Sequence, residues 1–488
     1  MKKLLKRYQY LILFFFSLYS GLLCYSFFSY SPPIFLVLFS IPFSLGGLYL
    51  AIKNFHALFS IMVFSLPLSI NQNKIDGDGF GISLPGELIV VFVAGAGLFH
   101  VMWNWERFKN IFTHWLTIVV LLHVVWMGVT TLTSVMTLVS VKFFIIRCIY
   151  VSVFFLLAID YLRSHSNVIR FYWIYVLSMV IPILYSINYH SQHDFTQAFS
   201  YEVGDPFYND HTIYAACLAI LIPFFILLIV YYGEVKKRKH QLFAGLALGL
   251  MIVAIVLSYS RAGWLSLVVA FVCFLLIKMG VRFHQAVLII VVAIGVFYFN
   301  GDKIIDKIKE NDVESSEGFF NHARSVANIS TDNSNIERLN RWVCALRMFE
   351  EKPIVGFGPG TYPFQYGQFQ LSQEMTWVSV RDGSVGGVHS EYLKPLSEMG
   401  ALGFLFFMVI IIGTLKIGLD LIQSENRHKD KSLILGIYLG FITYLIHGIV
   451  NFFLDTDKSS VLFWGAIAAI VAYDLQRKSV SKEIVKPD

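Results

Sequence analysis

Long apolar runs, repeated one after another, constrain the fold of this chain more than any other feature of its sequence. A helix of roughly 17 to 25 apolar residues crosses the ~30 Å hydrocarbon layer of a bilayer, and runs of this length recur along almost all of the 488 residues. Charged residues make up only 14% of the chain, whereas soluble domains contain about 25%. With a mean hydropathy of +0.65, the sequence predicts an all-α polytopic membrane protein.

We expect about fourteen transmembrane helices and one large gap in the apolar pattern. The spans are placed near residues 9–29, 34–52, 55–70, 86–102, 111–133, 141–160, 168–187, 211–232, 241–258, 262–280, 284–299, 397–417, 432–453 and 459–476. The expected division is 1–299 with the first eleven helices, 300–396 as a large loop with an amphipathic helix, and 397–488 with three helices and a tail. The first run shows no clear cleavage site and is expected to be a retained helix.

Lysine and arginine gather in alternate loops, which predicts the orientation of the chain. If the start "MKKLLKR" is cytoplasmic, the loops on the same side include "NWERFKN", "EVKKRKHQ" and "SENRHKDKS". Basic loops remain on the cytoplasmic side. We therefore expect both termini in the cytoplasm and the large loop on the periplasmic or outer face. The net charge of +6 then reflects topology rather than a nucleic-acid partner.

The cysteines and the glycine-rich segments do not indicate a metal or nucleotide site. The five cysteines have no CxxC or Cys/His spacing, and "GFGPG" lacks the Gly-Lys-Ser/Thr of a phosphate-binding loop. Asp76 and Asp78 in "IDGDGFG" have a spacing that suits a divalent cation, but aspartates between glycines more often form a turn. We expect no cofactor and no metal.

One segment of the large loop, "SNIERLNRWVCALRMFEEKP", has the signals of a helix. Ser334 precedes Glu337 at the spacing of a capping box. Apolar residues fall on one stripe, formed by Ile336, Leu339, Val343 and Leu346. Arg338 and Arg341 share a face. They belong either to a solvated surface, with Glu337 paired to Arg341, or to an anion site, if the helix lies across the membrane mouth.

Three further basic residues lie in or near expected spans on the outer side. Arg261, in "LSYSRAGWLSL", is at the mouth of a tight hairpin. Its position fits an interfacial arginine that snorkels to the membrane surface, and it equally fits an anion site. Arg147 lies inside its expected span, where an arginine costs roughly 2.5 to 3.5 kcal/mol. Lys142 is nearer to the same surface, and both are candidate substrate-binding residues.

Two histidines begin outer-facing helices. His389 follows "SVGGV" and precedes Ser390 and Glu391. A histidine there is either structural or a general base, since its ordinary pKa lies near operating pH. His211 opens the apolar run in "DPFYNDHTIYAACLAILIP". Contact with a sugar and N-capping by a neighbouring side chain both explain that segment.

Three segments in this order, "SYSRAGWL", "ERLNRWVCALRMFEEKPIVGFGPGTYPF" and "HSEYLKPLSEMGALGFLFF", resemble the O-antigen ligase and O-antigen polymerase superfamily. The specific part covers about Leu257 to Phe407. The resemblance implies a C-type membrane glycosyltransferase that takes a glycan from undecaprenyl diphosphate, with inversion and without a metal. It also implies that Arg261 and Arg338 act at the diphosphate and that His389 acts near the acceptor.

The acceptor and the class of protein stay open at this point. A ligase would use lipid A core as the acceptor, whereas a polymerase would use a growing glycan. A transporter of lipid-linked sugars, such as a flippase, is the alternative of another class. Transporters tend to have repeated halves and a site near the midplane, whereas the polar residues here gather at one surface. We therefore favour an enzyme that acts at the outer face.

Overall fold

The computed structural model describes residues 45–71, 83–289, 333–372, 386–424 and 428–484, together with positions 42, 291–292, 375 and 379. Across these residues the chain is helical, apart from turns and one antiparallel ladder of two short strands, β1 (Ile70–Asn71) and β2 (Ser83–Leu84). The helical class predicted from the apolar runs is therefore confirmed for the described part of the chain.

The helical elements follow one another in this order: α3 (Phe55–Ser65), the 3-10 turn η1 (Leu66–Leu68), α5 (Gly86–Trp103), α6 (Trp105–Phe112), α7 (Trp115–Leu132), α8 (Thr137–Tyr150), the π-helix η2 (Val151–Leu157), α9 (Ala158–Tyr161), α10 (His165–Ser191), the 3-10 helix η3 (Gln197–Glu202), α11 (His211–Glu234), α12 (Arg238–Leu257), α13 (Arg261–Lys278), α16 (Asn333–Glu351), α17 (Tyr362–Gln365), the 3-10 turn η5 (Tyr366–Phe369), α18 (Leu393–Ser424), α19 (His428–Val450) and α20 (Asp457–Ile484). Elements α8, η2 and α9 form one continuous stretch, Thr137–Tyr161.

Ten helical stretches of the described residues are long and apolar enough to cross a membrane. They coincide with ten of the eleven predicted spans between 86–102 and 459–476, all but the one near 284–299. The stretch near 55–70 corresponds to Phe55–Leu68, which is shorter than predicted. At about 1.5 Å per residue it is only about 20 Å long, less than the ~30 Å hydrocarbon layer. The span near 9–29 and parts of those near 34–52 and 284–299 lie outside the described residues. The count of fourteen is therefore not confirmed.

Helices α11, α19 and α20 form the centre of the bundle. Between 72% and 89% of their most apolar windows is buried, against 17% to 22% for α5, α12 and α13. A helix that is apolar all round can be buried on every side, and α11 is such a helix. On α5, α12 and α13, large apolar side chains such as Leu88, Leu246 and Phe271 are exposed. These three helices therefore present the apolar surface that contact with lipid requires.

Two glycines of α19 let it pack closely against α11. A Cβ atom at Gly440 would lie 2.4 Å from the carbonyl oxygen of Ile220, and one at Gly436 would lie 2.9 Å from the Cα of Phe224. The two glycines are one turn apart on the same face, a spacing that lets membrane helices approach backbone to backbone. This contact holds the two helices together within their central parts.

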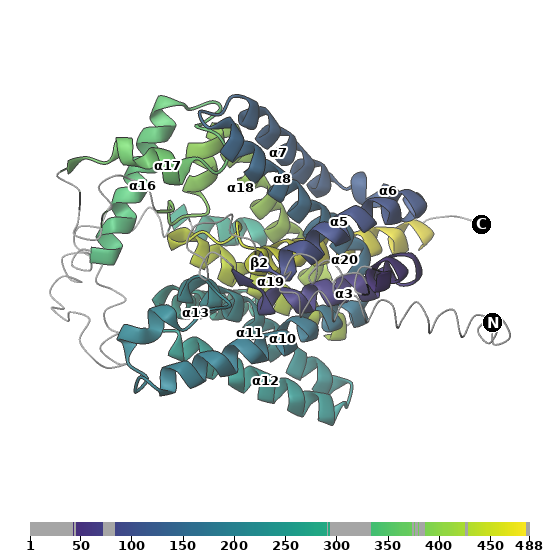
Figure 1. The fold of residues 1–488 in the computed structure, drawn as a ribbon. Coiled ribbons are helices and arrows are strands. Elements are labelled where there is room, and N and C mark those ends of the chain that lie inside the picture. Colours follow the sequence, from purple (N-terminus) through teal and green to yellow (C-terminus); the bar gives the residue numbers. More distant parts are fainter. Residues whose placement is uncertain are drawn as a thin grey trace, which may run out of the picture.

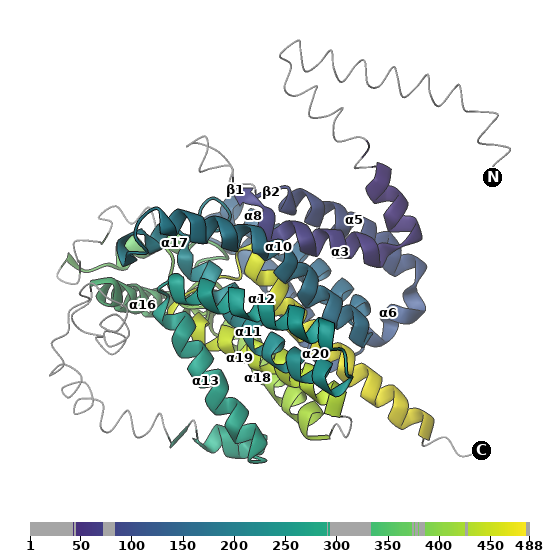
Figure 2. The same cartoon turned by 90° about the horizontal axis from the view of Figure 1, so that it is seen from below.

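The helix of the large loop and the C-terminal end of the chain lie at opposite ends of the molecule. In Figure 1, α16 and α17 are at the left, whereas α6 and the far end of α20 are at the right. The view from below in Figure 2 keeps α16 and α6 at the same two ends. This arrangement fits the predicted topology, in which the large loop and the C-terminus are on different faces, but which face is cytoplasmic stays a prediction.

Candidate functional site

A cavity of about 240 Å³ lies where the ends of α11, α13, α16 and α19 meet. Its polar lining includes Tyr201, His211, Thr212, Arg261, Arg338 and Asn451. Apolar residues of α19, among them Ile446 and Ile449, form another part of its wall. The structure therefore brings together three residues that the sequence singled out separately, Arg261, Arg338 and His211. The cavity combines cationic groups with an apolar side.

The tight turn between α12 and α13 places Arg261 at the cavity. Helix α12 ends at Leu257 and α13 begins at Arg261. The hydroxyl of Ser260 caps α13 by accepting a hydrogen bond from the N–H of Gly263 (3.3 Å). Trp264 donates from its indole nitrogen to the carbonyl oxygen of Ile255 (2.9 Å) and ties the two helices together. The hairpin inferred from "SRAG" thus holds its arginine at the mouth of the cavity.

Helix α16 carries Arg338, and it docks through the opposite face from the one that its apolar stripe suggests. Its buried side chains include Cys344, Ala345 and Met348, which pack with Phe357, Tyr362, Tyr366 and Val388. The stripe residues Leu339, Val343 and Leu346 are instead 37% to 43% exposed. The predicted helix is confirmed, and its apolar stripe faces away from the packed side.

Arg341 is buried on α16, and it is engaged by protein groups. Its Nε donates to Glu337 (2.9 Å), one of its terminal nitrogens donates to the carbonyl oxygen of Gly387 (3.1 Å), and its guanidinium lies over the ring of Tyr366. The i,i+4 pair with Glu337 forms as predicted, but the solvated face expected to carry it is wrong, because both side chains are buried. Arg341 is not among the described residues that line the cavity. Its positive charge nevertheless acts on the nearby His389.

His389 is not among the described residues that line the cavity, but it interacts with two that are, Arg338 and Asn451. Its carbonyl oxygen accepts a hydrogen bond from the indole nitrogen of Trp342 on α16 (3.0 Å), and its own side chain lies within hydrogen-bonding reach of Asn451. Burial lowers the pKa of His389 to about 4, and the positive charges of Arg341 and Arg338 add to the shift. At neutral pH the imidazole is therefore uncharged and able to accept a proton.

His211 is oriented by the residue before it. Asp210 caps α11 by accepting a hydrogen bond from the N–H of Thr212 (2.8 Å), and its carboxylate also meets Nδ1 of His211 (2.9 Å). Burial acts to raise the pKa of Asp210, but the contacts with His211 and Thr212 hold it below its usual value. Both predicted roles of the segment are compatible here, since Asp210 supplies the cap while His211 lines the cavity.

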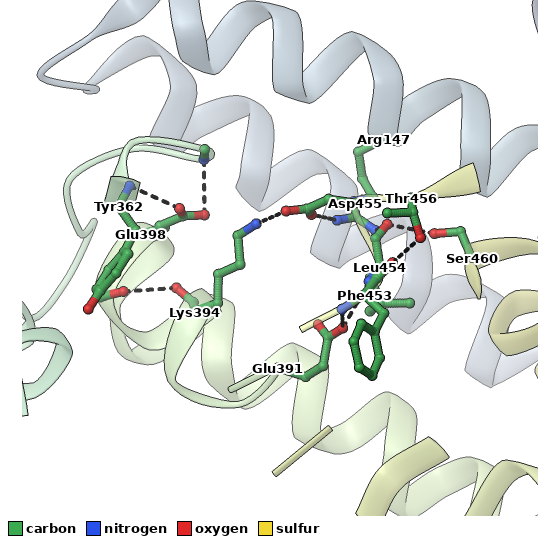
Figure 3. A network of polar contacts seen from close by, with 12 residues as sticks. Arg147, Tyr362, Glu391, Lys394, Glu398, Phe453, Leu454, Asp455, Thr456 and Ser460 are labelled. Carbon is green, nitrogen blue, oxygen red and sulfur yellow. Dashed lines mark hydrogen bonds and ion pairs between the residues drawn. The ribbon is translucent and has the colours of Figure 1, made fainter. Parts of the chain in front are cut away.

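Arg147 and Lys142 are not among the described residues that line the cavity. Arg147 donates to the carbonyl oxygen of Leu454 (2.9 Å) and to the carboxylate of Asp455 (3.0 Å), which also pairs with Lys394. Figure 3 shows this arrangement, with Asp455 between the arginine and the lysine. The arginine inside the predicted membrane span therefore has a protein partner, which is itself partly exposed. Lys142 is exposed on α8.

The same network holds the turn that carries Asn451. The Glu391 carboxylate accepts hydrogen bonds from the Tyr444 hydroxyl (2.6 Å) and from the backbone N–H groups of Leu454 (2.8 Å) and Phe453, as Figure 3 shows for the backbone contacts. The backbone N–H of Glu391 in turn donates to the carbonyl oxygens of Gly448 and Asn451. Because Glu391 is two residues after His389, this lock fixes the histidine relative to Asn451.

Sequence reasoning missed Tyr201, Thr212, Asn451 and Asp455. The first three are ordinary polar residues near the ends of apolar runs, and nothing in their spacing marks them. Asp455 was missed because its partner Arg147 is far away along the chain. No group of three or more His, Cys, Asp or Glu side chains among the described residues could hold a metal ion. Asp76 and Asp78 lie outside the described part of the chain.

The fold and this cavity define a polytopic helical membrane protein with a cationic site at one end of its bundle. Residues 246–408 match the family model of the O-antigen ligases, so the resemblance predicted from the three sequence segments is confirmed. The matched region includes Arg261, Arg338 and His389. A protein of Haemophilus influenzae strain Rd, described only as uncharacterized, is 25% identical over 284 residues, which are 56% of this chain and 68% of the relative.

Proposed function

We propose that this protein transfers a glycan from undecaprenyl diphosphate to an acceptor at the periplasmic face of the inner membrane. O-antigen ligation to lipid A core, an inverting reaction without a metal, is the function that the site supports best. The observation that carries the proposal is the cavity that joins Arg261 of α13 with Arg338 of α16, next to His389. The match of residues 246–408 to the family model of the O-antigen ligases supports the same reaction class.

Arg261 and Arg338 would bind the diphosphate of the donor. Guanidinium groups present planar pairs of N–H donors that fit phosphate oxygens. Diphosphate is also the leaving group, so negative charge develops on it as the bond to the sugar breaks. Cations already positioned there stabilise the transition state more than the ground state. The apolar wall of α19 would face the beginning of the lipid chain.

His389 would accept the proton of the attacking acceptor hydroxyl. The reaction forms the new glycosidic bond from the acceptor oxygen to the anomeric carbon, breaks the bond to the diphosphate, and leaves the hydroxyl proton on the imidazole. An anionic donor offsets the charges of Arg338 and Arg341, which raises the pKa of His389 in the complex. Binding of the donor therefore makes the histidine a stronger base.

The proposal is tested with purified protein, a lipid-diphosphate-linked glycan and lipid A core, in excess EDTA. We expect sustained formation of glycan attached to core. Activity that disappears with EDTA and returns with Mg²⁺ or Mn²⁺ would contradict the metal-free mechanism. In a deletion strain, loss of all glycan from core supports ligation, whereas core that carries one repeat unit supports polymerisation, the alternative of the same superfamily.

A further inference from the structure

A second cavity, of about 160 Å³, adjoins the cationic one and has acidic walls. We call it the acidic cavity. Its polar lining includes Ser83, Glu87, Asn209, Asp455, Asp457 and Lys458. These residues come from the ladder strand β2, the start of α5, the segment before α11 and the start of α20. Ser83 and Glu87 are partly exposed and Asn209 is exposed, so the cavity opens to the surface.

The two cavities share two walls. In the segment before and into α11, Asn209 and Ile213 line the acidic cavity, whereas His211 and Thr212 line the cationic one. In the turn between α19 and α20, Asn451 lines the cationic cavity and residues 455–458 line the acidic cavity. The start of α11 and the turn between α19 and α20 therefore lie between a ligand in the acidic cavity and the proposed diphosphate site.

Asp457 is a carboxylate that needs further hydrogen-bond donors. Only 3% of its surface is exposed, and one of its oxygens, Oδ2, has no hydrogen-bond partner. Lys458 does not fill this place, since its ammonium group donates to the carbonyl oxygens of Ser69 (2.8 Å) and Phe207. Glu87 lies near enough for its charge to interact with Asp457. A buried acceptor without a donor is costly, so this wall is suited to a ligand that supplies donors.

Asp455 also lines the acidic cavity, but unlike Asp457 it is paired with cationic side chains. Arg147 and Lys394 both bond to its carboxylate, yet 30% of its side chain remains exposed. A carboxylate accepts hydrogen bonds at more than two positions. Asp455 can therefore hold a ligand hydroxyl while it stays paired with both cations.

We propose that the acidic cavity binds the sugar hydroxyls of the glycan acceptor, an inference that rests on the proposed transferase function. Sugar hydroxyls donate to carboxylates, and the exposed Asn209 amide offers both a donor and an acceptor at the rim. A metal ion is a weaker fit, because the described carboxylates and histidines form no group of three that could hold one. The shared walls would then present one acceptor hydroxyl to the cationic cavity.

The test measures binding of two ligands separately to the purified full chain. The acceptor probe is labelled oligosaccharide released from lipid A core of a strain without O antigen, and the donor probe is undecaprenyl-diphosphate-linked glycan. Glu87→Gln and Asp457→Asn should each weaken oligosaccharide binding about tenfold, since a charged acceptor is replaced by a neutral one, with donor binding within twofold. Arg261→Ala should weaken donor binding only. Asp194→Asn removes an exposed carboxylate that lines neither cavity and should change the binding of neither ligand.

Glu87→Gln guards against misfolding, because Glu87 is only partly buried. If the oligosaccharide binds Glu87→Gln and Asp457→Asn as it binds the wild type, or binds no form of the protein, the acidic cavity is not an acceptor site. If the wild type transfers glycan but oligosaccharide binding is unaffected by these substitutions, the proposed function stands and only the acceptor-site inference is contradicted. Oligosaccharide binding that depends on Glu87, in a protein that transfers no glycan, would contradict the proposed function and leave the acidic cavity as a sugar-binding site.

Discussion

At the scale of single residues, Arg341 differs in position from the two arginines that line the cavity. Arg341 is fixed by Glu337, by a backbone carbonyl and by an aromatic ring, and this set of contacts suits a structural cation. Arg261 and Arg338 instead line the cavity from two helices that are far apart in the chain. A pair assembled in this way is expected where one ligand must meet both charges.

We expect Arg261→Ala and Arg338→Ala each to lower glycan transfer by about 10²- to 10³-fold, the cost typical of removing one donor from a site where charge develops. The lysine variants should recover little, because an ammonium group is a point charge and cannot replace a planar pair of donors. The measurement is initial transfer rate at equal amounts of folded protein. Arg282→Ala, at an exposed arginine beyond the other end of α13, is the matched control. Wild-type rates in Arg261→Ala would exclude a diphosphate site at this cavity.

The lowered pKa of His389 predicts an unusual pH profile. The histidine accepts a proton only when neutral, so the acid limb of kcat/KM that it causes should lie near pH 4, its pKa in the free protein, and not near 6.5. Burial is the main cause, and Arg341 and Arg338 push in the same direction, whereas Asp210 and Asn451 oppose them. Arg341→Gln removes a cation that disfavours the protonated form, so the limb should move to higher pH.

Arg341→Lys keeps the charge and is the control for this shift. His389→Gln should abolish the limb together with most of the activity, because the amide hydrogen-bonds but does not accept a proton at neutral pH. A positioned base typically contributes about 10² to 10⁴ in rate. Full transfer by His389→Gln would mean that the residue only orients the acceptor.

At the scale of elements, the ion network ties α8, the start of α18 and the turn before α20 into one unit (Figure 3). Removing one member of a largely buried ion network leaves the remaining charges less well compensated, which destabilises the fold. We expect Arg147→Ala to lower the thermal midpoint of the purified protein strongly, because Asp455 is left with Lys394 alone. Arg170→Ala, at an exposed arginine, should have almost no effect. A stable but inactive Arg147→Ala protein would show instead that Arg147 serves the substrate.

The contact between α11 and α19 makes a second prediction at this scale. Gly440→Ala should lower the thermal midpoint, because its Cβ would lie 2.4 Å from a backbone oxygen of α11 and the two helices must separate. Gly245→Ala on α12 is a close control, since no atom lies within 4 Å of a Cβ there. That substitution should be neutral or slightly stabilising, as alanine has the better helix propensity. Equal midpoints for the two variants would contradict close packing at this interface.

Elements were more predictable from the sequence than the contacts between them. Apolar length alone placed ten spans, because a membrane helix satisfies its own backbone hydrogen bonds and needs no partner to form. The buried side of α16 was not predictable. Its apolar stripe is exposed, whereas the smaller Cys344 and Ala345 are buried, since the loop that follows offers a surface that admits small side chains. The Arg147–Asp455 pair was hidden for a similar reason, as only the folded chain brings its members together.

At the scale of the whole molecule, polar groups are sorted between two ends. The cationic cavity is lined by the ends of α11, α13, α16 and α19, and the acidic cavity by β2, the starts of α5, α11 and α20 and the turn before α20. Helix α6 lies at the end of the molecule away from α16 (Figures 1 and 2). The alternating basic loops of the sequence predict that these two ends are on different faces of the membrane, and this orientation stays a prediction. An enzyme that takes a lipid-bound donor from one leaflet needs its site at one membrane surface, and the arrangement meets that requirement.

The orientation of this arrangement in the membrane is tested by cysteine labelling. Gln192 follows α10 and Lys237 follows α11, both are exposed, and the 24 residues of α11 span about 36 Å at about 1.5 Å per residue, enough to put the two positions on different faces. In a version without native cysteines, Gln192→Cys should react with an impermeant maleimide in intact spheroplasts, and Lys237→Cys should react only after the membrane is opened. The physical reason is that the basic segment around Lys237 is retained on the cytoplasmic side. Labelling of position 237 in intact spheroplasts would invert the molecule, place both cavities in the cytoplasm, and remove the basis for a periplasmic transferase.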